Sequence, residues 1–349
     1  MQLLKHVIGI DIAKDSFTAA SGTIDIQQNK TISAPGTYKN TPAGFATLEK
    51  MIRREHQRLV KTAESTEQEL PLWIVMEATG VYYEALAFWL VDRGYAVVIV
   101  LPNNIKHFAR SDNRKSKTDA IDAVTITCYG LEKTLKPWKP ALELWSDLKS
   151  LTREHDSSTR ELTEVSNRLH ALEHAARTPK PTIRRLRQQR DLLKKQLKQI
   201  EQEIKELIES DPELKESVRF ISSIKGIAMM TAAKILGETD NFALVEQSSQ
   251  LISFSGLDPM LRESGNYKGK VMISHKGNRM IRSALYMPAL SAIRCNPQMR
   301  AFYQRLVARG TAPKKAIVAV MCKLLRLMFT LWKKRERFDP AFASAVPAA

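Results

Sequence analysis

The feature that most constrains the fold is a pair of short apolar runs that each end in a carboxylate. Residues 7–10 precede Asp11, and residues 72–76 precede Glu77. Runs of this length, rich in β-branched residues and followed by turn residues, predict buried β-strands. A carboxylate inside or at the end of such a strand is costly to bury unless a partner or a cation compensates its charge. Each run therefore carries a candidate functional acid.

Two further acids, Asp119 and Asp122, are three residues apart in a stretch with helical character, so they share one helix face. Together with Asp11 and Glu77 they offer the oxygen ligands that hard divalent cations prefer. The sequence thus predicts a Mg²⁺ site, in which Mn²⁺ can substitute. Taken singly, the acids also fit a turn, a cap or a solvated helix face. The neighbouring Lys117 fits a phosphate contact or an ordinary surface lysine equally well.

The first third of the chain alternates strand and helix patterns, which predicts an α/β sheet. In such a sheet, functional carboxylates are expected at strand ends. The expected elements are two or three strands over 6–34, a helix over 41–59, a strand over 73–76, a helix over 82–93 and a strand over 96–101.

From residue 144 the apolar spacing changes to alternating steps of four and three, which is the heptad pattern of a coiled coil. A first seam runs from Leu144 to Leu172, a break follows at residues 178–181, and a second seam runs from Leu186 to Leu207. The pattern predicts two helical arms that pair either within one chain or between subunits. Their basic surface fits a solvated face or a nucleic-acid contact.

The last third combines Gly turns with clustered cations. Residues 220–237 resemble a helix–hairpin–helix in which Lys225 and Gly226 would meet a phosphate, or form a purely structural turn. Ser264 precedes Gly265 in a basic loop, and by itself it reads as a turn serine. The cations predicted to bind nucleic acid here are Arg262, Lys268, Lys270, Lys276, Arg279 and Arg282.

Charge is uneven along the chain. Of the net +17, residues 1–130 supply only +1, from 15 Lys/Arg and 14 Asp/Glu, so the rest points to a polyanion bound by the later residues. The three cysteines are scattered, which argues against a disulfide framework or a zinc knuckle. Without a signal peptide or long apolar segment, we expect a cytoplasmic, nucleoid-associated protein with no membrane partner.

Taken together, these motifs resemble the DEDD transposases of bacterial insertion sequences over about residues 6–340. In that family the acids at Asp11, Glu77, Asp119 and Asp122 belong to a RuvC/RNase H-like domain, and the serine at Ser264 is the DNA nucleophile. The hairpin turn departs from the family pattern, because Lys225 and Ala228 stand at its outer positions.

The resemblance implies a RuvC-like α/β domain over 1–135, a coiled-coil stalk over 136–210, a mainly helical transposase domain over 211–340 and a disordered tail over 341–349. It also implies a site-specific recombinase that joins donor and target double-stranded DNA through a phosphoserine intermediate. A structured non-coding guide RNA and a homodimer or tetramer are the further expected partners.

Two other functions fit part of the pattern. A metal-dependent junction-resolving nuclease would use the four acids to activate water, but would leave Ser264 and its cationic loop unexplained. A non-enzymatic architectural DNA-binding protein would explain the charge but not the carboxylates at strand ends.

Overall fold

A computed structural model describes residues 2–63, 70–111, 118–260, 263–264, 267–269 and 271–339, with backbone only at 263–264 and 267–268. Lys117, Arg262, Lys270 and the predicted tail lie outside these residues. The chain divides into two compact units, Met1–Pro140 and Ala141–Ala349.

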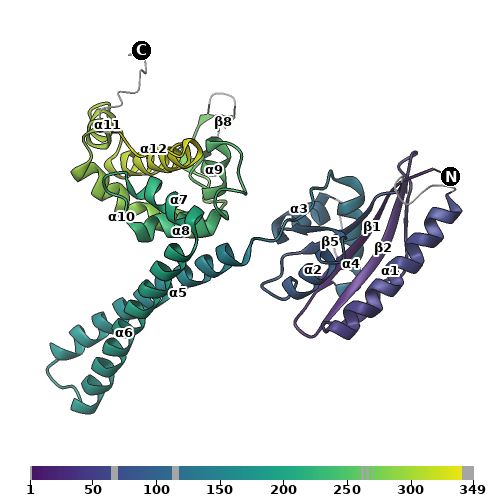
Figure 1. The fold of residues 1–349 in the computed structure, drawn as a ribbon, viewed down its shortest axis with the longest axis horizontal. Coiled ribbons are helices and arrows are strands. Elements are labelled where there is room, and N and C mark those ends of the chain that lie inside the picture. Colours follow the sequence, from purple (N-terminus) through teal and green to yellow (C-terminus); the bar gives the residue numbers. More distant parts are fainter. Residues whose placement is uncertain are drawn as a thin grey trace. The chain divides into compact units, whose positions relative to one another are not determined.

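In the described part of the first unit, the strands form one six-stranded mixed sheet (Figure 1). Its order is β3-β2-β1-β5-β6, and β4 also pairs with β2. Strand β1 is antiparallel to β2 and parallel to β5, and β5 is parallel to β6. The strands are β1 (Leu3–Ile12), β2 (Ser16–Asp25), β3 (Lys30–Ile32), β4 (Gly36–Lys39), β5 (Leu72–Glu77) and β6 (Ala96–Val100).

Alternate residues of β1 face opposite sides of the sheet, and helices cover both sides. Ile8 and Ile10 join the apolar core formed with helices α1 (Pro42–Thr62) and α2 (Glu84–Val91). Val7 belongs to the other core, together with Ile105 of α3 (Pro102–Ser111) and Ile126 of α4 (Asp119–Glu132). Both faces of the sheet are therefore buried, which explains why the strands read as continuous apolar runs.

A pair of imidazoles, of which His6 is buried and His56 half-buried, lies between β1 and α1. His6 is fully buried, and its Nδ1 is 3.0 Å from Nδ1 of His56 while its Nε2 is 2.9 Å from Oγ of Ser21. Burial, together with the nearby charges of His56 and Arg58, lowers the pKa of His6 to about 3. His6 is therefore neutral in the folded protein at neutral pH.

The described part of the second unit is mainly helical. Two long helices, α5 and α6, form a hairpin, and shorter helices form a bundle at its base (Figure 1). The helices are α5 (Glu143–Glu173), α6 (Lys180–Ser210), α7 (Pro212–Ser222), α8 (Met229–Thr239), α9 (Ser248–Ser255), α10 (Arg279–Cys295), α11 (Pro297–Ala308) and α12 (Pro313–Lys334). Four two-residue strands pair as β7 (Pro259–Met260) with β10 (Met272–Ile273), and β8 (Glu263–Ser264) with β9 (Tyr267–Lys268).

The apolar seams of α5 and α6 pack against each other within the chain. Near the hairpin tip, Leu169 shares a small core with Leu186. Nearer the bundle, Leu148 and Ile204 are fully buried in the main core of the unit. Each arm thus covers the apolar stripe of the other. No helix in the described ranges is both long enough and apolar enough to cross a membrane.

Candidate functional site: a carboxylate edge and a basic segment

The register of the parallel strands aligns two of the predicted acids. Gly9 of β1 is paired with Val75 of β5, and Asp11 and Glu77 each follow two residues later. Because side chains alternate along a strand, all four residues belong to the same face of the sheet. Asp11 and Glu77 therefore occupy neighbouring positions where β1 and β5 end.

Helix α4 packs on this same face, and a glycine allows its close approach. A Cβ on Gly9 would lie 2.3 Å from both the backbone N and Oγ1 of Thr127, and 2.8 Å from the Ala123 carbonyl oxygen. Thr127 Oγ1 donates to that carbonyl at 2.8 Å. Only glycine leaves room for this contact. Asp122 immediately precedes Ala123, so the close approach brings the first turn of α4 over the sheet.

The direction of α4 carries that first turn toward Asp11. The far end of the helix lies over Val7, because a Cβ on Gly130 would be 2.7 Å from Val7 Cγ1. Ala123 lies over Gly9, two residues farther along β1. The helix therefore runs antiparallel to β1. Its first turn, with Asp119 and Asp122, lies toward the strand end that carries Asp11.

Local interactions hold this edge in place. Thr118 Oγ1 accepts a hydrogen bond from Ile121 N at 3.3 Å and caps α4, so the two helical acids stand at the positive end of the helix dipole. Asn40 Nδ2 donates to the carbonyls of Ala13, at 3.0 Å, and Tyr82, at 3.2 Å. That side chain ties the turn after β1 to the loop after β5.

The donor set suits a hard cation. Asp11, Glu77 and Asp122 are half-buried and Asp119 is exposed, and all four supply carboxylate oxygens. Among the described residues, however, no three His, Cys, Asp or Glu side chains are close enough to share one metal ion. The backbone brings the acids to one edge of the sheet, and their side chains do not form a closed set of ligands.

In the second unit, the segment over 257–277 contains Ser264 and is closed at its base. Ser274 Oγ donates to Asp258 Oδ1 at 2.6 Å. Arg282 Nη1 donates to the carbonyls of Ser255, at 2.8 Å, and Gly277, at 3.2 Å. The Arg282 guanidinium therefore makes hydrogen bonds within the protein.

The other residues predicted to bind or attack nucleic acid in this region make fewer contacts that the structure describes. Lys276 and Arg279 are exposed. Ser264 lies in β8, where its backbone is paired with Tyr267, and Lys268 lies in β9. The side chains of Ser264 and Lys268 are outside the described residues, so their roles stay predictions.

The turn between α7 and α8 is packed against α10. Gly226 has φ +102°, and a Cβ there would lie 2.7 Å from the backbone N and Cα of Ala292. Lys225 beside it is exposed. The glycine thus has a structural reason to be present, and phosphate binding at this turn stays a prediction.

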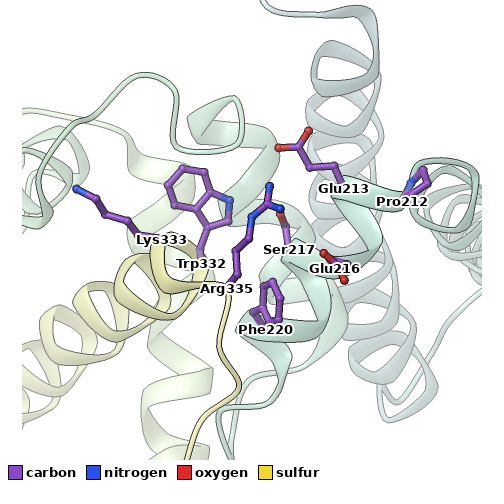
Figure 2. Close-up of a pocket in the computed structure, with 8 residues that line it drawn as sticks. All are labelled: Pro212, Glu213, Glu216, Ser217, Phe220, Trp332, Lys333 and Arg335. Atoms are coloured by element: carbon purple, nitrogen blue, oxygen red, sulfur yellow. The ribbon is translucent and has the colours of Figure 1, made fainter.

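A pocket of about 510 Å³ lies between α7 and the end of α12 (Figure 2). Its lining combines carboxylates, cations and aromatic rings, and Trp332 Nε1 donates to Asn241 Oδ1 at 2.8 Å. None of the predicted site residues lines it. The lining residues are Pro212, Glu213, Glu216, Ser217, Phe220, Trp332, Lys333 and Arg335.

Sequence reasoning missed Gly9. The available signal was a glycine inside an otherwise apolar strand, which indicates close approach of another backbone.

Two family models match separate stretches of the chain. Residues 8–173, which include the four acids, match a DEDD transposase model of the IS110 type. Residues 218–304, which include Ser264, match a model described as the transposase IS116/IS110/IS902 family.

Individual relatives match to different extents. The pilin gene-inverting protein of Moraxella lacunata is 29% identical over 337 residues, which are 96% of this chain and 98% of that protein. The transposase for insertion sequence element IS1111A of Coxiella burnetii is 25% identical over 35% of each chain. A 43.6 kDa protein of insertion element IS110 from Streptomyces coelicolor is 23% identical over 44% of this chain and 37% of its own length. The chain belongs to the IS110/IS116 family of transposases, enzymes that cut and rejoin DNA.

Proposed function

We propose that the chain is a site-specific recombinase of a mobile insertion sequence, which exchanges strands between donor and target DNA. A relative that matches nearly its whole length is named a pilin gene-inverting protein, and inversion also joins ends from two DNA sites. This full-length similarity supports recombination rather than cleavage alone.

In this proposal Ser264 is the nucleophile. Its Oγ attacks a backbone phosphorus, an Oγ–P bond forms and one P–O bond to deoxyribose breaks. The hydroxyl proton leaves the serine, and the released deoxyribose oxygen takes up a proton. The phosphoserine ester conserves the phosphodiester energy, so a second DNA hydroxyl can displace the serine without a cofactor that supplies energy. Cations stabilise the charge that develops on the phosphate, and the exposed Lys276 and Arg279 are available for this.

The carboxylates are proposed to bind Mg²⁺, or Mn²⁺ in its place, through Asp11, Glu77, Asp119 and Asp122. The observation that carries the proposal is the convergence of β1, β5 and the first turn of α4 on one edge of the sheet. A bound divalent ion would supply Lewis-acid stabilisation to a phosphate. The residues themselves supply negative oxygen ligands from three separate elements, which fits a hard cation.

The partners are proposed from the family. A structured guide RNA and a homodimer or tetramer are what the resemblance implies, and the excess of cations in residues 131–349 fits RNA and DNA equally. The exposed Lys225 is proposed to contact the same backbone, as are the cations outside the described residues, Lys117, Arg262 and Lys270.

A metal-dependent nuclease without a covalent serine is the second candidate, because the carboxylate edge supports it as well. The two functions differ in their products. A nuclease releases nicked DNA, whereas the serine recombinase yields a covalent adduct and rejoined junctions.

The test uses a plasmid that carries the gene with its native flanking DNA, so that the cell supplies any RNA encoded there. Cells are lysed in denaturant, protein–DNA adducts are recovered, and new junctions are sequenced. We expect Ser264→Ala to lose both products while nucleic acid still copurifies with the protein. The matched control is Ser283→Ala on α10, an exposed serine whose Oγ bonds to the carbonyl of Met280. An adduct that persists in Ser264→Ala would refute the nucleophile.

A further inference from the structure

A buried carboxylate outside the carboxylate edge joins three parts of the second unit. Glu238 on α8 is 2% exposed. Arg153 on α5 binds it through two nitrogens, Nε to Oε1 at 2.6 Å and Nη2 to Oε2 at 2.9 Å. Asn278 Nδ2 donates to Oε2 at 2.7 Å. Glu238 therefore links α5 to the residue at which the Ser264 segment ends.

The environment keeps this buried group ionised. Burial by itself would raise the pKa of Glu238, but the hydrogen bonds from Arg153 and Asn278 and the charge of Arg153 lower it below its ordinary value. The Arg153 side chain is 51% exposed although Glu238 is buried, so the ion pair is only partly removed from water and is weak evidence for stability. A role in fixing the position of Asn278 relative to α5 explains the presence of the pair better.

Asn278 is the point where that geometry reaches the Ser264 segment. Its Oδ1 accepts from Met280 N at 2.8 Å and Ile281 N at 3.2 Å, which caps α10. Its backbone N donates to the Phe254 carbonyl at 2.7 Å. Asn278 thus fixes the start of α10 through its side chain and the exit of the segment through its backbone N.

The two ends of the segment are held together beside Asn278. β7 pairs with β10, and Ser274 binds Asp258 at the segment base. A displacement of Asn278 is therefore transmitted to the base that supports Ser264.

We propose that Glu238 is a positioning residue that holds the base of the Ser264 segment in register with the α5–α6 hairpin. This inference rests on the proposed function, since it concerns the placement of the proposed nucleophile. When the hairpin shifts, Arg153 and Glu238 carry the shift to Asn278, so the hairpin and the nucleophile move as one body.

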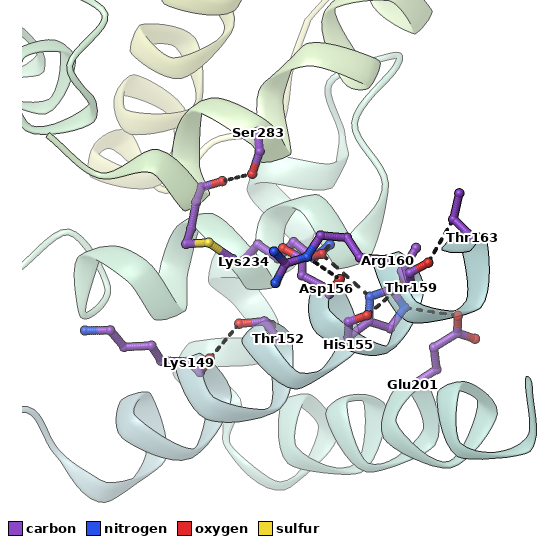
Figure 3. A network of polar contacts seen from close by, with 11 residues as sticks. Lys149, Thr152, His155, Asp156, Thr159, Arg160, Thr163, Glu201, Lys234 and Ser283 are labelled. Atoms are coloured by element: carbon purple, nitrogen blue, oxygen red, sulfur yellow. Dashed lines mark hydrogen bonds and ion pairs between the residues drawn. The ribbon is translucent and has the colours of Figure 1, made fainter. Parts of the chain in front are cut away.

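A second polar bridge between the same two helices provides the control. Lys234 of α8 forms an ion pair with Asp156 of α5, and His155 Nε2 is 3.4 Å from Glu201 Oε1 of α6 (Figure 3). The Lys234–Asp156 bridge lies one turn along α5 and α8 from the Arg153–Glu238 pair. Among the described residues, neither Lys234 nor Asp156 has a hydrogen bond to Asn278. Its loss weakens the α5–α8 contact without acting directly on the Ser264 segment.

The test changes the contact and keeps the helix cap. Asn278→Asp retains an oxygen that caps α10, but it places a carboxylate against Glu238. Adding Glu238→Gln restores a hydrogen bond of reversed direction, because the new amide NH₂ at the Oε2 position donates to the new carboxylate. The amide oxygen at the Oε1 position still accepts from Arg153 Nε, whereas Arg153 Nη2 loses its acceptor. Asp156→Asn is the matched control, and Ser264→Ala is run in the same cells.

Covalent adducts and new junctions are measured with the full chain and the plasmid described above, together with thermal unfolding and copurifying nucleic acid. We expect Asn278→Asp to lose about 10²-fold in adduct, as for a misplacement of roughly 1 Å, with nucleic-acid binding retained. The double variant should recover most of this loss. Asp156→Asn should keep its adduct level even where its stability falls.

The inference is overturned when Asn278→Asp forms adduct at the level of Asp156→Asn, or when the double variant folds and shows no recovery. The proposed nucleophile fails separately, when Ser264→Ala itself retains the adduct. A destabilised Asn278→Asp is still informative, because recovery of adduct in the double variant is compared at equal folded fraction.

Discussion

Replacing Gly9 by alanine tests whether the close packing of α4 on β1 sets the carboxylate edge. The new Cβ would lie 2.3 Å from the Thr127 backbone N, whereas ordinary van der Waals contact begins near 3.4 Å. The helix must therefore move by about 1 Å, the difference between those two distances. Backbone atoms are involved, so a change of rotamer does not relieve the contact.

We expect Gly9→Ala to lower both the stability of the fold and the rate of strand cleavage. Overpacking of this kind destabilises a core by about 1–3 kcal/mol. Moving Asp119 and Asp122 by about 1 Å relative to Asp11 should cost about 10²-fold in strand cleavage. The loss of activity should therefore be far greater than the loss of folded protein.

Gly130→Ala is the matched control on the same helix. Its Cβ would meet methyl carbons, Val7 Cγ1 at 2.7 Å and Val75 Cγ2 at 2.9 Å, at the end of α4 away from Asp119. We expect a comparable loss of stability with cleavage largely retained. Melting curves give the folded fraction, and sequenced junctions from the plasmid assay give the activity. Wild-type activity in folded Gly9→Ala, or an equal loss in Gly130→Ala, would refute the reasoning.

Two further predictions concern the hairpin and pH. Leu197→Glu with Ile204→Glu should unfold the α5–α6 hairpin, because Ile204 is fully buried between arms of the same chain. Unchanged helicity by circular dichroism, together with an oligomer that dissociates in light scattering, would show that the arms pair between subunits instead. The depressed pKa of His6, about 3 against an ordinary 6.5, means that the unfolded chain binds the extra proton between these values, so stability rises with pH there. From pH 7 to pH 5 unfolding free energy should fall by about 2 kcal/mol from this group, and denaturant titrations of His6→Gln should show a shallower dependence.

Features set by local sequence were predictable. The run before Asp11 became β1, residues 72–77 became β5, and the Thr41–Pro42 start gave α1 because the threonine side chain caps the helix. The heptad spacing located α5 and α6, with the break where Pro179 stands before α6. In each case, neighbouring residues carry the information.

Contacts between distant residues were not predictable in the same way. The approach of α4 depends on Gly9 and Thr127, which are far apart in the sequence. The pairing of Glu238 with Asn278 joins residues 40 positions apart, and each alone reads as an ordinary surface or turn residue. The strands within 259–273 are two residues long, too short to show a period of two.

The uneven distribution of charge along the chain predicts how metal removal affects DNA cleavage and nucleic-acid retention. Residues 131–349 hold 39 Lys/Arg and 23 Asp/Glu, a net +16, so attraction for phosphates comes mainly from them. The acids at the sheet edge repel phosphate until a cation neutralises them. EDTA should therefore abolish strand cleavage and leave nucleic-acid retention and its salt dependence nearly unchanged, and Asp122→Asn should do the same with Mg²⁺ present. Retention and adduct are measured in the same reactions, on labelled DNA from the flanks of the gene with copurified nucleic acid left on the protein. Loss of retention together with cleavage would mean that the metal mainly serves binding, and would contradict the assignment of binding to the basic residues.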